Sequence, residues 1–117
     1  MDLRILPSSA HAFMDYALGA TALAAPAMFG FSRYSTPTML SRGMGIYTLV
    51  SALTTRNKGG LLKALPWNAH LKMDAISNVL AWSSPWLLGF ASNKRARRTI
   101  LVLAALQGVV WLLSKRR

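Results

Sequence analysis

Apolar residues gather in four blocks that are separated by charged and polar residues. The blocks cover residues 16–32, 43–55, 75–93 and 99–114. A membrane-spanning helix needs about 17–25 mostly apolar residues. The third block clears that length comfortably by itself. The others need flanking residues such as Asp15, Arg42 and Arg98 inside the helix, where the long basic side chains of the arginines can reach the headgroups. The pattern predicts an all-α fold, an integral membrane four-helix bundle. A soluble bundle is the alternative, but it would carry charge along one face of every helix.

Proline, glycine and hydroxyl residues mark the ends of the predicted helices. Serines 8 and 9 follow Pro7 and can cap the first helix, while Thr36 can cap the second ahead of Pro37. The expected helices run from residues 8–9 to 30, 36 to 54–56, 66–68 to 89, and about 93 to 114.

A 21-residue segment occurs twice, at residues 11–31 and 70–90, with seven identical positions and a constant offset of 59 residues. The duplication predicts two tandem helical hairpins, residues 1–56 and 69–117, joined by a linker at 57–68. A unit with two crossings returns to its starting side, so both hairpins are expected to run in the same direction about a pseudo-twofold axis. The second helices of the repeats match only loosely, through Gly45 with Gly108 and Ser51 with Ser114.

Each copy ends in a proline followed four residues later by glycine and then phenylalanine. Pro26 and Pro85 are expected to kink their helices, because each removes a backbone hydrogen bond to the carbonyl of Ala22 or Ala81. Gly30 and Gly89 are expected to end the helices in a left-handed conformation.

The second copy contains Asp74 and Asn78 ahead of the run SPWLLGF at residues 84–90. This arrangement resembles the SPW-repeat family of small membrane proteins, while the first copy, APAMFGF at residues 25–31, lacks the serine and tryptophan. The resemblance implies paired membrane helices and no general activity.

The two histidines of the chain each precede an aspartate by four residues, as His11 with Asp15 and His70 with Asp74. This spacing places both side chains on one face of a helix. Asn78 extends the second stripe, and Tyr47 and Gln107 are expected at a similar depth, where they could complete a polar cluster.

Several roles are open for the His/Asp pairs. Two nitrogens and two carboxylates suit a divalent transition metal such as zinc, iron or manganese. The same groups could move protons, or each aspartate could pair with histidine, Arg56 or Lys115 and fix helix register. Haem held by both histidines is a further variant, which the adjacent acids make awkward.

Fourteen Lys and Arg against three acids give a net charge of +11, and the basic residues fall in short runs between apolar blocks. We therefore expect anionic lipid headgroups, and not nucleic acid, as the partner.

The sequence contains no nucleophile elbow, phosphate loop or HExxH motif that would argue for an enzyme. Small-residue helix faces allow a homo-oligomer or docking to a larger membrane complex. A small excess of basic residues on the terminal side favours cytoplasmic termini.

Together these patterns predict a structural or accessory membrane subunit with a pseudo-symmetric His/Asp cluster. A small proton- or metal-coupled membrane transporter is the alternative function.

Overall fold

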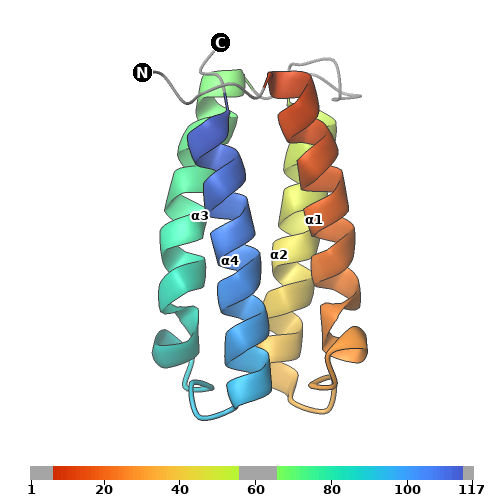
Figure 1. The fold of residues 1–117 in the computed structure, drawn as a ribbon, viewed down its shortest axis with the longest axis vertical. Coiled ribbons are helices and arrows are strands. Elements are labelled where there is room, and N and C mark those ends of the chain that lie inside the picture. The colour runs from red at the N-terminus through yellow and green to blue at the C-terminus, as the bar shows by residue number, and fades with distance from the viewer. Residues whose placement is uncertain (1–6, 56–65, 115–117) are drawn as a thin grey trace.

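The computed structural model describes residues 7–55 and 66–114, and within these ranges the chain forms four α-helices that stand side by side (Figure 1). Helix α1 spans Ser8–Met28 and α2 spans Ser35–Thr54, while α3 spans Trp67–Leu87 and α4 spans Lys94–Leu113. The predicted all-α, four-helix architecture is confirmed.

The duplication extends over both helices of each hairpin. Every bound of α1 and α2 recurs 59 residues later as a bound of α3 or α4. Helices α1 and α3 begin at the end of the bundle where α2 and α4 end, so both hairpins run in the same direction (Figure 1). The constant offset pairs Thr55 with Ser114. The looser alignment of Ser51 with Ser114 and Gly45 with Gly108 is therefore wrong by four residues, about one helical turn.

The helix starts differ from the expected caps. Pro7 and Tyr34 occupy the N-cap positions of α1 and α2, and neither makes a side-chain cap hydrogen bond. The predicted capping by a serine and by Thr36 is therefore wrong, because these residues lie inside the first turns. Asn93 caps α4 by accepting a hydrogen bond from the backbone amide of Ala96 at 3.2 Å. Most of the predicted linker, 57–68, lies outside the described residues, and its last two residues belong to α3.

Both hairpins turn through the same glycine-centred motif. Gly30 and Gly89 adopt φ angles of 75° and 79°, the left-handed region that glycine enters without steric cost. The amide of Phe31 donates to the carbonyl of Pro26 at 2.9 Å, and its repeat counterpart donates likewise at 2.8 Å. These are the long-range bonds of a Schellman termination, and they confirm the predicted left-handed helix ends.

The carbonyls freed by the two prolines are both satisfied by serine hydroxyls. Ser41 donates to the carbonyl of Ala22, and Ser84 donates to that of Ala81, each at 2.7 Å. The final turn of α1 and of α3 is set off sideways from the turns before it (Figure 1). The carbonyls that Pro26 and Pro85 free are therefore hydrogen-bonded within the bundle.

The helices of the two hairpins pack against each other through different residues at equivalent positions. In the first hairpin Gly19 and Gly45 let the backbones of α1 and α2 approach, so a Cβ on Gly45 would lie 2.7 Å from the Gly19 carbonyl oxygen. In the second, Asn78 takes the place of Gly19 and donates to the carbonyl of Ala104 at 2.7 Å. Gly108 leaves room for that amide, because a Cβ at this position would lie 3.2 Å from the Asn78 Oδ1 atom.

Substituting Gly45→Ala is expected to lower the free energy of unfolding by about 1–3 kcal/mol, because α1 and α2 must separate to admit the methyl group. The control is Gly43→Ala on the same helix, where a Cβ has no heavy atom within 4 Å. The control is expected to be neutral or to gain about 0.5–1 kcal/mol from the lower chain entropy. Thermal unfolding of both variants in detergent measures the difference, and equal unfolding temperatures would contradict the close approach.

Alanines make up much of the buried interior, together with a few large side chains such as Phe31 and Ile100, and many large apolar residues are exposed. Alanines 12, 22, 25, 52, 81, 96 and 104 are buried, whereas Phe13, Met39, Val79 and Leu87 are each 68–73% exposed. Within the described part of the chain, α4 is the one helix that is long and apolar enough, by length and composition, to cross a membrane. Four membrane-spanning helices were expected from the sequence, and by length and composition α4 is the one that qualifies among the described residues.

Candidate functional site

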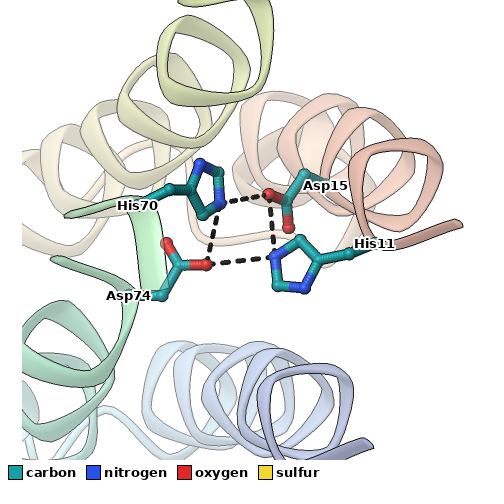
Figure 2. Close-up of side chains that lie close together, drawn as sticks. All are labelled: His11, Asp15, His70 and Asp74. Atoms are coloured by element: carbon teal, nitrogen blue, oxygen red, sulfur yellow. Dashed lines mark hydrogen bonds and ion pairs between the residues drawn. The ribbon is translucent and has the colours of Figure 1, made fainter. Parts of the chain in front are cut away.

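The His/Asp pairs of the two repeats meet in the interior between α1 and α3. His11 and Asp15 come from α1, and His70 and Asp74 come from α3 (Figure 2). The four residues are only 1–3% exposed. They converge because each pair occupies one helix face and because the two helices run in the same direction on either side of the pseudo-twofold axis.

The four groups form a closed ring in which imidazole nitrogens alternate with carboxylate oxygens (Figure 2). The Nε2 atom of His11 lies 3.2 Å from Asp15 Oδ2 and 3.1 Å from Asp74 Oδ2. The Nε2 atom of His70 lies 3.0 Å from each of the same two oxygens. Each histidine therefore contacts the aspartate of its own helix and that of the other hairpin equally. We call His11, Asp15, His70 and Asp74 the His/Asp ring.

Each histidine is held from outside the ring by a hydroxyl residue that follows the second helix of the opposite hairpin. The Nδ1 atom of His11 is hydrogen-bonded to Ser114 Oγ, and that of His70 to Thr55 Oγ1. These hydroxyls follow α4 and α2 in matching extended conformations, with φ and ψ of −78° and 138° for Ser114 and −77° and 141° for Thr55. The arrangement obeys the same pseudo-twofold symmetry as the ring.

Thr55 and Ser114 are site residues that the sequence reasoning missed. The 59-residue offset that relates the histidines also relates these two hydroxyls. Extending that offset through the second helices, instead of matching Ser51 with Ser114, would have paired these two hydroxyls, although not shown their contacts with the histidines.

The indole of Trp67 contacts both histidines of the ring. Its ring centroid lies 4.9 Å from that of His11 in an edge-to-face contact and 5.4 Å from that of His70 in a stacked contact. Edge-to-face and stacked arrangements are the favoured geometries of aromatic pairs and stabilise the ring positions. The Trp67 indole therefore helps to fix both histidines in place.

Two other polar residues predicted for the cluster, Asn78 and Gln107, lie outside the ring. Asn78 bonds to α4, through the Ala104 carbonyl and through Gln107 Oε1 at 3.2 Å. Gln107 also donates to Ser77 Oγ at 3.4 Å. The Tyr47 hydroxyl is buried near Asp74 and Ser77, and it makes no hydrogen bond of good geometry among the described residues. The structure thus places Asn78 and Gln107 in the packing of α3 on α4, outside the ring.

The ring geometry restricts the possible chemistry. Because all four side chains are nearly inaccessible, the ring can hold a proton or a small ion but cannot receive an organic substrate in this conformation. The histidine ring centroids are 5.2 Å apart and the two carboxylates lie between the Nε2 atoms, where a porphyrin would have to fit. This geometry argues against haem.

Substituting Thr55→Val is expected to lower the free energy of unfolding by about 1–3 kcal/mol, because it removes the buried hydroxyl partner of His70 Nδ1 and leaves that nitrogen unsatisfied. Thr54→Val is the control. Its hydroxyl bonds only to carbonyls of its own helix, so a change of no more than about 0.5 kcal/mol is expected. Thermal or denaturant unfolding compares the pair, and an equal loss in both would contradict the assigned role of Thr55.

Comparison with protein-family models, curated proteins and solved structures found no match. The function is therefore argued from the site and the surface of this chain.

Proposed function

We propose that this chain is a small multi-pass membrane protein that serves as a structural or accessory subunit, with its two hairpins joined by the His/Asp ring. The observation that carries the proposal is that both hairpins contribute equally to one buried polar ring, inside a bundle that exposes many large apolar side chains. The resemblance to the SPW-repeat family points the same way.

The surface composition supports a lipid environment. Large apolar side chains such as Met39, Ile46 and Val102 are more than half exposed, and extended apolar patches mark membrane or protein contact sites. Small residues at helix interfaces are typical of membrane bundles, where close packing drives association. Helices of 20–21 residues are about 30 Å long, which matches the hydrocarbon thickness.

Inward-facing polar residues explain why mean hydropathy underrates α1 and α3. The charged residue of α1 is Asp15, which lies in the ring. In α3 the aspartate is likewise buried, and Lys72 is exposed one turn from the helix start, where it can reach headgroups. The lipid-facing surfaces are therefore more apolar than the whole-helix averages.

The ring supplies specific contacts between the hairpins. His11 bonds to Asp74 and Ser114, and His70 bonds to Asp15 and Thr55. Each histidine therefore makes two hydrogen bonds to the other hairpin. Paired, hydrogen-bonded ionisable groups are tolerated in a membrane interior when they face one another. The ring would fix the register of one hairpin against the other.

A small proton- or metal-coupled transporter is the second candidate. Buried His and Asp groups form proton relays in transport proteins. Transport requires access to the ring from both sides of the membrane, whereas the four groups are at most 3% exposed. The structural role is therefore favoured.

The natural absence of cysteine allows a direct test by labelling single-cysteine variants in intact cells. Ser32→Cys and Ser92→Cys place the label in the two hairpin turns, and Ser9→Cys places it at the start of α1; all three positions are exposed. A membrane-impermeant maleimide is expected to label Ser32→Cys and Ser92→Cys from one side of the membrane and Ser9→Cys from the other. The wild-type chain is expected to stay in the membrane pellet after carbonate extraction. Release by carbonate, or labelling of all three from one side, would overturn the proposal.

A further inference from the structure

We propose that the His/Asp ring binds one divalent first-row transition metal ion at its centre, through Nε2 of both histidines and Oδ2 of both aspartates. The inference rests on the proposed function in treating the ring as the junction of the hairpins, and it adds the ion that completes this junction. Zn²⁺ is the probe that we choose. The ligand atoms of the four buried residues all lie within 4.8 Å of one another.

The outer hydroxyls determine which histidine nitrogens face the centre without a proton. Ser114 Oγ donates its hydrogen to the Val110 carbonyl at 2.6 Å, and Thr55 Oγ1 donates to the Ser51 carbonyl. A hydroxyl has one hydrogen, so each must accept at its contact with a histidine. The Nδ1 atoms of His11 and His70 are therefore the donors, and in neutral imidazoles the Nε2 atoms carry lone pairs.

With neutral histidines, four acceptor atoms then face one another at 3.0–3.2 Å with no hydrogen between them. Such a ring needs positive charge, either as a proton on each Nε2 or as a cation at the centre. A protonated Nε2 has a single N–H, which points best at one acceptor. Here each Nε2 is almost equidistant from two oxygens. That equality favours a shared central cation over two separate protons.

The spacing and charge fit a divalent ion. Zinc ligands at about 2.0–2.1 Å in tetrahedral geometry are separated by about 3.3 Å. The four nitrogen-to-oxygen separations of 3.0–3.2 Å are close to that value, and the diagonal pairs, within 4.8 Å, would draw closer when an ion binds. Two carboxylates balance a divalent cation with both histidines neutral, so the buried site has no net charge. Four protein ligands also give the closed coordination of a structural site.

The donor types select the class of metal. Imidazole with carboxylate suits zinc, iron and manganese, whereas calcium and magnesium prefer all-oxygen sites. The contacts from Thr55 and Ser114 to the Nδ1 atoms are of the kind that orients metal-binding histidines. Removing such an outer partner commonly weakens metal affinity about 10–100-fold.

The test uses the full chain in mild detergent, with the affinity tag cleaved off and metal content measured by mass spectrometry. We expect about one transition-metal ion per chain, or uptake of one Zn²⁺ after chelator treatment and dialysis. We expect loss of binding in Asp15→Asn and in His70→Gln, and a 10–100-fold weaker affinity in Thr55→Val. Lys72→Gln and Thr54→Val are the matched controls and are expected to bind as the wild type does.

A spectroscopic readout on the wild type avoids dependence on variants that fail to fold. Co²⁺ added to the metal-free chain is expected to give the intense visible absorption of a four-coordinate site, and Zn²⁺ is expected to remove it. Folded wild-type protein, shown by circular dichroism, that takes up neither Zn²⁺ nor Co²⁺ would overturn the metal assignment. That outcome is independent of carbonate extraction and cysteine labelling, which test the membrane proposal.

Discussion

Substituting Asp74→Ala is expected to lower the free energy of unfolding by about 3–5 kcal/mol, the typical effect of removing one partner from a buried charged group. Asp74 is 3% exposed and contacts the Nε2 atoms of both histidines. Its removal leaves a cavity and a positively charged centre that faces a single carboxylate. The loss applies whether the centre holds a metal ion or protons.

Denaturant unfolding in detergent, followed by circular dichroism, measures this loss. Lys72→Ala is the matched control, because it lies two residues away on α3 and is exposed. The control is expected to change stability by no more than about 0.5 kcal/mol. A loss below about 1 kcal/mol in Asp74→Ala would contradict the structural importance of the ring.

Removing the proposed metal ion is the second change with a large expected effect. When free Zn²⁺ is about 1,000 times its dissociation constant, binding to the folded state alone contributes about 4 kcal/mol. A chelator is therefore expected to lower the unfolding temperature of the wild-type chain, and Zn²⁺ to restore it. Mg²⁺ is not expected to restore it, because two of the four ligands are imidazole nitrogens.

The control for metal removal is Asp15→Asn, which lacks one of the four ligands. Chelator and Zn²⁺ are expected to leave its unfolding temperature unchanged. An equal chelator effect in this variant would show that the metal stabilises another part of the chain. No effect in the wild type would leave protons as the charge that holds the ring together.

The fold and the ring followed from the duplicated pattern. A single His-x-x-x-Asp spacing is common by chance, but its recurrence 59 residues later in a hairpin of the same direction places two such pairs on facing helices. Hydrophobic blocks and proline–glycine ends gave the four helices, although the caps at Pro7 and Tyr34 were missed. Because neither N-cap residue makes a side-chain hydrogen bond, the sequence contains no capping residue type at these positions that could have been recognised.

The parts that were missed depend on contacts between helices. Thr55 and Ser114 reach the histidines because α2 and α4 end beside the starts of α3 and α1, and sequence periodicity does not give that depth. Asn78 was expected on the polar stripe with Asp74, four residues away on the same helix. Its side chain bonds to the Ala104 carbonyl on α4 instead. In the first hairpin the equivalent positions are Gly19 and Gly45, whose backbones lie close together and leave no room for a side chain.

The central claim is that residues of both hairpins act as one unit, and a double-mutant cycle between Asp15→Asn and His70→Gln tests it most directly. The two side chains come from different hairpins and lie 3.0 Å apart. We expect the double variant to lose less stability than the sum of the single losses, with a coupling of about 1–3 kcal/mol. His70→Gln combined with Thr99→Ala, whose hydroxyl bonds within α4, is the additive control. Additive losses for Asp15→Asn and His70→Gln would contradict the claim that the ring joins the hairpins.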